Sequence, residues 1–276
     1  PRFFASLAGF CVATFGLSII KGFNKSAGSS NLLAETGFTR FAIVIAVIFI
    51  VTIGITITNV KEESTLNSKV KRTGLKQALN IIVKNDQLLA FIGLLLTFNL
   101  CTQIAKGFAV YYFKNVCGNE DLYAIFGFAI IAEMFGLVIF PKVASKISRE
   151  KVYALACGCV ILGLGLLGIM GFVIPTSVPG TILCCGIMFL GSGLSLGVTT
   201  CCMADVIDYG EVKFGVRNES VTCSAQTFLM KAAMAAAGGL TGVGLQIVGY
   251  NAKLEVQSAA TVAGIRILMI VIPIII

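Results

Sequence analysis

Eight long runs of apolar residues decide what this chain can fold into. A helix that crosses a bilayer needs about 20 mostly apolar residues, and the runs are of this order. Apolar residues make up 57% of the chain and charged residues 12%, against about 45–50% and about 25% in soluble domains. The runs do not alternate in polarity as the strands of a membrane β-barrel do. The sequence therefore predicts an all-α integral membrane protein with spans at residues 3–20, 41–60, 88–113, 122–140, 152–174, 181–203, 221–248 and 260–276.

The basic residues gather in the connectors between these runs. The formal net charge is +8, and Lys and Arg stand in short stretches without interleaved aromatic residues, which indicates membrane topology rather than nucleic-acid binding. The positive-inside rule places connectors 61–84 and 142–151 in the cytoplasm and connectors 114–121 and 175–180 outside. Helix counting also places the acidic loop 205–219 inside, where its four acids need a reason other than topology.

The ten cysteines form no CxxC pair, and the chain contains no histidine. A Cys/His metal site, a histidine proton relay and a Ser–His or Cys–His catalytic pair are therefore excluded. Nearly all cysteines lie inside apolar runs, where a thiol acts as a small hydrophobic group. We predict no metal site, no cofactor and no enzymatic activity.

Lys231 is the strongest functional candidate, because an ionisable side chain within a spanning helix costs at least about 2.5–3.5 kcal/mol on insertion scales. Thr227 lies four residues before it and shares its helix face, with Gln226 beside it. Hydroxyl, amide and ammonium groups on one stripe suit a bound sugar or a carboxylate across a cavity. The alternative is a structural pair between Lys231 and an acid of a neighbouring helix.

A second group lies at the end of the run 181–203. Three acids follow at intervals of three residues and would share one face of a continuing helix, with an arginine close behind. Such an acidic edge suits ion pairs that form with basic residues of another half in one state and break in the other. The alternative is an ordinary solvated helix end. The candidate gate residues are Asp205, Asp208, Glu211 and Arg217.

A third group, Asn99, Gln103 and Lys106, draws a polar stripe along the span 88–113. Glu133, in the middle of the next span, is a possible counter-ion for Lys106. The stripe either lines a cavity or belongs to a structural ion pair, and the sequence leaves both open. Arg2 opens the first span at its cytoplasmic side and could serve as a plain positive-inside residue.

Several of these residues stand in segments that resemble a known family. The segments are PRFFASLAG at 1–9, KNDQL at 84–88, GFAVYYF at 107–113, ADVIDYGE at 204–211, and Gln226-Thr227 with Lys231. They occur in the order and spacing of the glycoside–pentoside–hexuronide:cation symporters of the major facilitator superfamily. The resemblance runs over essentially the whole chain.

The resemblance implies symport of a glycoside, galactoside or uronide with Na⁺, Li⁺ or H⁺ by alternating access. It places Arg2 near the sugar, Thr227 and Lys231 toward the sugar and cation region, and the acidic edge with Arg217 at an inner gate. The implied partners are the sugar, the monovalent cation and the bilayer. The protein would be monomeric when full length and would lie in the bacterial cytoplasmic membrane as a multi-pass protein.

The fold implied is an incomplete major facilitator fold with about eight of twelve transmembrane helices. Residues 1–60 would be the last two helices of the N-terminal six-helix bundle. Residues 61–87 would be a cytoplasmic central loop, in which residues 75–83 have the apolar spacing of an amphipathic helix. Residues 88–276 would be the C-terminal six-helix bundle, with a last helix that is truncated and interrupted by Arg266.

Four helices would then be missing from the front, where the family keeps its principal sugar- and cation-binding acids. We therefore expect that residues 1–276 do not transport alone. A rival hypothesis is a non-transporting membrane sensor or scaffold that descends from a truncated transporter. An integral-membrane enzyme is the third class, but it needs a nucleophile–base pair or a metal site, and two acids such as Asp205 and Asp208 do not make one.

Overall fold

The computed structural model describes residues 7–8, 11, 15, 19–20, 22–26, 35–59, 81–215, 217, 219–251, 254 and 256–276. Within these ranges the chain is helical, and six helices are long and apolar enough to cross a membrane. The chain divides into two compact units, Pro1–Thr73 and Gly74–Ile276, and each is described by itself.

The first unit contains one long helix, α2 (Glu35–Asn59), whose most apolar window has no buried residue. Asn24 anchors its beginning, because its side-chain oxygen accepts a hydrogen bond from the Thr36 hydroxyl at 2.8 Å. Along α2, Phe41 and Ile45 share a shallow apolar groove with Phe15 and Ile19. A helix that is apolar on every side and exposed along its length is suited to lipid contact.

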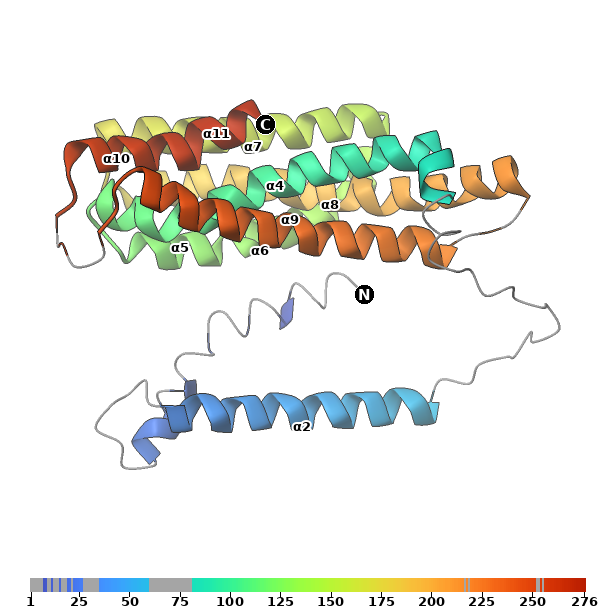
Figure 1. Cartoon of the computed structure of the whole chain (residues 1–276), viewed down its shortest axis with the longest axis horizontal. Helices are drawn as coiled ribbons and strands as arrows, with labels where there is room; N and C mark the ends of the chain where they lie inside the picture. The colour runs from blue at the N-terminus through green and yellow to red at the C-terminus, as the bar shows by residue number, and fades with distance from the viewer. Residues whose placement is uncertain are drawn as a thin grey trace. The chain divides into compact units, whose positions relative to one another are not determined.

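The second unit is a bundle in which successive long helices run back and forth (Figure 1). Its elements are α4 (Asp86–Asn115), α5 (Leu122–Phe128), α6 (Ile130–Ala144), α7 (Arg149–Val173), α8 (Val178–Phe214), α9 (Glu219–Ile247), α10 (Ala259–Arg266), the π-helical turn η1 (Ile267–Val271) and α11 (Ile272–Ile275). Helix α8 packs along α6 and α7, whereas α4 packs along α9 and the chain of α10, η1 and α11. The all-α membrane fold predicted from the sequence is confirmed, and the seven predicted spans from residue 41 onward are helical over the residues that the structure describes.

Polar residues set where these helices begin. Asn85 accepts a hydrogen bond from the backbone N–H of Leu88 at 3.0 Å and caps α4. Ser177 and Ser258 cap α8 and α10 in the same way. Each cap satisfies one of the backbone N–H groups that a helix start leaves without an intrahelical partner, which fixes the start in the sequence.

The centre of the bundle is an aromatic and aliphatic core on α4. Phe108, Tyr112 and Phe113 are fully buried there among side chains of α7, α8 and η1. The Tyr112 hydroxyl donates a 2.6 Å hydrogen bond to the carbonyl of Leu167 in α7. The polar group of this buried tyrosine therefore has a hydrogen-bond partner.

The last predicted span differs from expectation in its interior. Arg266 does not interrupt the helix, which continues from α10 through η1 into α11. The π-helical turn lies just before Pro273, which has no N–H to offer to the preceding turn. The carbonyl of Pro273 accepts a hydrogen bond from the Cys101 thiol of α4 at 3.0 Å.

The predicted amphipathic helix lies mostly outside the described residues. Of the segment 75–83, only residues 81–83 are described, and together with Lys84 they are helical. Ile82 packs against the cluster of Leu88, Phe91, Leu95 and Val206. The predicted span 3–20 falls on residues of which only 7–8, 11, 15 and 19–20 are described.

Candidate functional site

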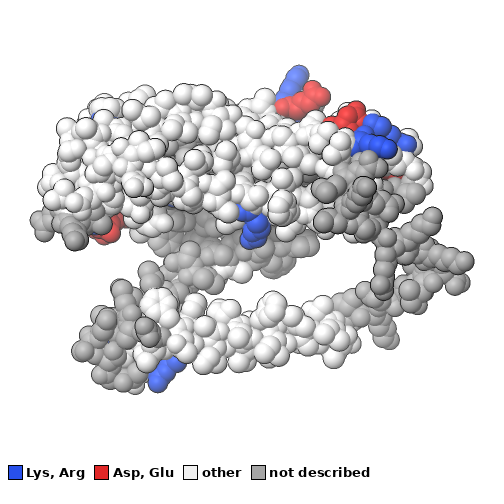
Figure 2. Space-filling model, viewed as in Figure 1, with Lys and Arg blue, Asp and Glu red and all other residues white. Residues whose placement is uncertain are grey.

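Charged side chains gather at the end of the bundle where α4, α7 and α9 begin and α8 finishes, and much of the visible face elsewhere is uncharged (Figure 2). We call this the charged end. Helix α8 reaches it because the helix continues eleven residues past the predicted span end at Met203 and stops at Phe214. Gly215 then adopts a positive φ of 69° and closes the helix, as a C-terminal glycine does. The acidic segment is therefore helix and not loop.

Arg217 forms ion pairs with three carboxylates at the charged end. Its guanidinium donates to Asp208 at 2.9 Å, to Glu211 at 2.8 Å and to Glu219 at 3.3 Å. These carboxylates, with Glu211 first, raise the pKa of Arg217 above its ordinary value, so the side chain is charged at every physiological pH. Helix α8 is thereby joined to the start of α9.

Asp205 points elsewhere and pairs with Arg149 at the first turn of α7. Three residues of an α-helix cover about 300°, so each acid in the series lies about 60° around the helix axis from the one before it. Asp208 and Glu211 still share Arg217, whereas Asp205 has turned toward α7. The structure thus pairs these three acids with residues of their own unit.

Sequence reasoning missed a third contact at the charged end. Asp86, the first residue of α4, accepts hydrogen bonds from the Tyr209 hydroxyl at 2.9 Å and from the Lys213 ammonium at 2.6 Å. Tyr209 and Lys213 stand four residues apart on α8 and so face the same way. The Asn85-Asp86 helix start and the i, i+4 pair were both visible in the sequence, but nothing there said that the two would meet.

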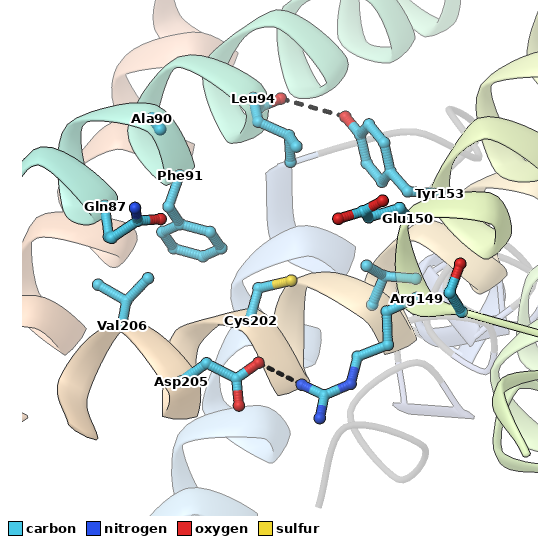
Figure 3. A pocket seen from close by; sticks show the side chains of 12 residues that line it. Gln87, Ala90, Phe91, Leu94, Arg149, Glu150, Tyr153, Cys202, Asp205 and Val206 are labelled. Atoms are coloured by element: carbon cyan, nitrogen blue, oxygen red, sulfur yellow. Dashed lines mark hydrogen bonds and ion pairs between the residues drawn. The ribbon is translucent and has the colours of Figure 1, made fainter. Parts of the chain in front are cut away.

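A pocket of about 710 Å³ opens between α4, α7 and α8 next to these pairs (Figure 3). Gln87 and Phe91 line it from α4, and Arg149 and Glu150 line it from α7. At its inner side the Tyr153 hydroxyl donates a long 3.4 Å hydrogen bond to the carbonyl of Leu94. The walls are thus apolar toward the membrane interior and charged toward the mouth.

The structure joins Lys106 and Glu133, the pair considered from the sequence. Their charged atoms are 3.6 Å apart, with 33% of the Lys106 side chain and 17% of the Glu133 side chain exposed. The Lys106 ammonium also lies 4.9 Å from the ring centre of Phe189, where a cation–π contact is favourable. A third of the Lys106 side chain remains exposed, so the pair leaves part of this side chain accessible.

The other two residues of the α4 stripe are partly buried. The Asn99 side chain donates a 2.8 Å hydrogen bond to the carbonyl of Leu95, one turn earlier in the same helix. Gln103 lies between Asn99 and Lys106 along α4. The three side chains therefore follow one strip of the helix, with Lys106 the member held by another helix.

On α9 the three predicted residues divide between two directions. Gln226 is buried, whereas Thr227 and Lys231 are exposed on a different side of the helix. The Thr227 hydroxyl donates to the carbonyl of Cys223 at 3.0 Å and borders a shallow hollow beside Phe228. Within the described part of the chain no acid lies at ion-pair distance from Lys231. The remaining candidate, Arg2, lies outside the described residues.

Comparisons with known proteins place this architecture in a family. The family described as MFS/sugar transport protein matches residues 1–276. An uncharacterised symporter of Bacillus subtilis, YjmB, is 30% identical over 77% of this chain and 44% of its own length. The isoprimeverose transporter of Lactiplantibacillus pentosus is 29% identical over 99% of this chain and 56% of its own length. The raffinose carrier protein of Pediococcus pentosaceus is 27% identical over 95% and 40%, respectively.

The chain spans about half the length of the relatives it matches. The match to the family covers every residue of the chain, and the helices of the second unit have the length and apolar character that membrane transporters need. This chain is therefore a multi-pass membrane protein that belongs to the sugar transport family of the major facilitator superfamily, a family of transporters and not of enzymes.

Proposed function

We propose that the protein which contains this chain is a secondary active transporter that carries a glycoside, galactoside or uronide together with Na⁺, Li⁺ or H⁺. The observation that carries the proposal is Lys231, an exposed ammonium in the middle of a membrane helix within a sugar-transport family member. A charge in that position is costly unless it serves a substrate, an ion or a partner across a cavity. Relatives named for isoprimeverose and raffinose support a glycoside as the substrate.

The polar strips of α4 and α9 supply the sugar side of this proposal. Asn99, Gln103 and Lys106 follow α4, while Thr227 and Lys231 share the exposed face of α9. Amides, hydroxyls and ammonium groups donate hydrogen bonds to sugar hydroxyls, and an ammonium can also meet a uronate carboxylate. Gln226 and Arg2 complete the proposed set of sugar-binding residues. Gln226 is the buried member of this set.

The charged end supplies the inner gate. Alternating access requires contacts that close the inner mouth in one state and part in the other. Exposed ion pairs suit this task because each contributes little net stability and can exchange partners. We assign the gate to Asp205, Asp208, Glu211 and Arg217, whose partners in the present arrangement belong to the same unit.

The proposal includes the organisation of the whole protein. Residues 1–60 belong to an N-terminal bundle, 61–87 to a cytoplasmic central loop and 88–276 to the C-terminal bundle. The protein acts as a monomer in the bacterial cytoplasmic membrane and uses no cofactor other than the coupling cation. The basic connectors face the cytoplasm, which places the charged end on that side.

Uptake into membrane vesicles tests the proposal. The complete protein encoded by the gene is reconstituted, and labelled galactosides and glucuronides are offered with an inward gradient of Na⁺, Li⁺ or H⁺ in turn. Accumulation that depends on one of these gradients is the expected result. Normal insertion without gradient-driven accumulation of any sugar would instead favour the non-transporting sensor or scaffold.

A further inference from the structure

The first turn of α4 is held against the last turns of α8 by a contact outside the proposed sugar and gate sets. Asp86 accepts one hydrogen bond from a neutral hydroxyl, Tyr209, and one from an ammonium, Lys213. The Lys213 ammonium also lies 5.4 Å from the ring centre of Tyr209, so the two donors support each other. We call these three residues the α4–α8 clamp.

The backbone around the clamp is closely fitted. Asn85, which caps α4, is 2% exposed, and its amide faces Gly210 of α8. A Cβ added at Gly210 would lie 3.1 Å from that amide nitrogen, so a larger side chain there would have to displace the Asn85 amide. Below the clamp, Leu88 and Phe91 of α4 pack against Val206 of α8. The clamp therefore closes the outer side of an interface that is already well packed.

Helix α9 also supports the start of α4, because Leu229 and Met230 pack against the cluster that contains Leu88 and Phe91, but the side of α4 that faces α7 has no comparable contact there. There the pocket of about 710 Å³ separates α4 from α7, as the side chains around it show (Figure 3). Helix α7 is tied to α8 by the Arg149–Asp205 pair on the far wall of the same pocket. At this end helix α8 is joined to α7 by the Arg149–Asp205 pair and to α4 by the clamp, which adds polar side-chain contacts to the packing of Leu88 and Phe91 on Val206.

We propose that Asp86, Tyr209 and Lys213 are positioning residues for transport, which make α4 move with α8 when the inner mouth opens. The inference rests on the proposed function. Alternating access is largely a rocking of rigid bundles, so the helix that carries Asn99, Gln103 and Lys106 has to follow the helix that carries the gate acids. The clamp makes that connection at the end where the displacement is largest.

Hydrogen exchange tests the clamp without any transport measurement. In Asp86→Asn and in Lys213→Met, the backbone amides in the first two turns of α4 exchange at least severalfold faster than in the unchanged protein, while those in the last two turns of α7 do not change. The matched control is the exposed pair Lys114–Glu120 at the opposite end of α4, 3.7 Å apart, changed by Lys114→Met. Unchanged exchange at the start of α4 in both clamp variants would overturn the proposal.

Transport by the complete protein separates positioning from simple loss of folded protein. Asp86→Asn and Lys213→Met lower turnover per inserted molecule about tenfold at an unchanged half-saturating sugar concentration, and Tyr209→Phe lowers it less because Lys213 still holds Asp86. The exchanged pair Asp86→Lys with Lys213→Asp restores turnover. Variants that insert normally and turn over at the full rate would overturn the proposal, as would a restored α4 exchange rate without restored turnover. If the unchanged protein carries no sugar, the proposed function fails while the exchange measurement still decides on the clamp.

Discussion

Arg266 of α10 donates a hydrogen bond of 3.0 Å to the backbone carbonyl of Gly171 in the last turn of α7. The carbonyls of the last helical turn have no intrahelical partner, and the partial negative charge at this end of a helix stabilises a nearby cation. The guanidinium carbon also lies 3.7 Å from the ring centre of Phe172, which is close enough for stacking. Arg266, which was predicted to interrupt the span 260–276, thus caps the C-terminal end of α7.

Replacing this arginine by methionine should loosen the contact between α10 and α7. The change removes a charged hydrogen bond and a cation–π contact, for which we expect a loss of about 1–3 kcal/mol. The measurement is thermal unfolding of the purified protein in detergent, and Arg266→Lys should lose less because it keeps a donor. A methionine variant that melts with the unchanged protein would contradict this role.

The crossing of α6 and α8 depends on two facing glycines. A Cβ added at Gly193 would overlap the carbonyl of Glu133, and one added at Gly136 would lie 2.5 Å from the carbonyl of Leu190. Small residues at such crossings let membrane helices approach closely. Gly193→Val and Gly136→Val should therefore destabilise the bundle by about 1–3 kcal/mol, the usual effect of overpacking.

Gly186 on the same helix is the matched control, because a Cβ there meets no atom within 4 Å. Gly186→Val should melt within a degree or two of the unchanged protein in the same detergent, since a shift of this size is less than about 1 kcal/mol. Equal losses at all three positions would show that valine itself, rather than the close approach, is responsible.

The Lys106–Glu133 pair should show strong coupling in a double-mutant cycle. Lys106→Met leaves a mostly buried carboxylate without its cation, and Glu133→Gln leaves the cation with only the Phe189 ring. Each single change should cost less than the about 3–5 kcal/mol of a fully buried pair, because both side chains retain some exposure. The double variant should lose less stability than the sum of the two singles, and additive losses in thermal unfolding would show that the two side chains are not coupled.

Lys231→Ala in the complete protein should abolish gradient-driven sugar uptake while leaving insertion and thermal stability near normal. The reason is that Lys231 is exposed and its ammonium makes no ion pair within the described part of the chain, so its removal breaks no ion pair there. Lys114→Ala, which removes an exposed lysine at a helix end, is the control for a general effect of charge. Uptake at the normal level would remove Lys231 from the proposed sugar site.

The apolar runs predicted the spans well because lipid makes length and hydropathy the dominant constraints. The run 88–113 became α4 (Asp86–Asn115), and the run 152–174 became α7 (Arg149–Val173). The predicted span 181–203 ends before α8 does, because hydropathy falls where the charged residues begin, whereas the helix continues to Phe214. Its true end is marked by Gly215, a signal of helix termination that hydropathy does not contain.

The candidate residues were recognisable, but most of their partners were not. The possible pairing of Lys106 with Glu133 followed from neighbouring spans, and the structure contains it. The contacts of Asp86 with Tyr209 and Lys213 join residues more than 120 positions apart, and only the packing of α4 against α8 decides that they meet. The same holds for Arg266, whose partner is a backbone carbonyl and carries no side-chain signal.

The 37 residues of α8 make a rod about 55 Å long, whereas the hydrocarbon of a bilayer is about 30 Å thick. Roughly half of this rod therefore extends beyond the hydrocarbon, chiefly at the charged end. A rod pivoting within the membrane works as a lever, so a small tilt at the glycine crossing with α6 produces a larger sweep of its tip. Asp205, Tyr209 and Lys213 lie on that outer arm, so a tilt of α8 would displace these residues and the helix starts paired with them more than the residues at the crossing.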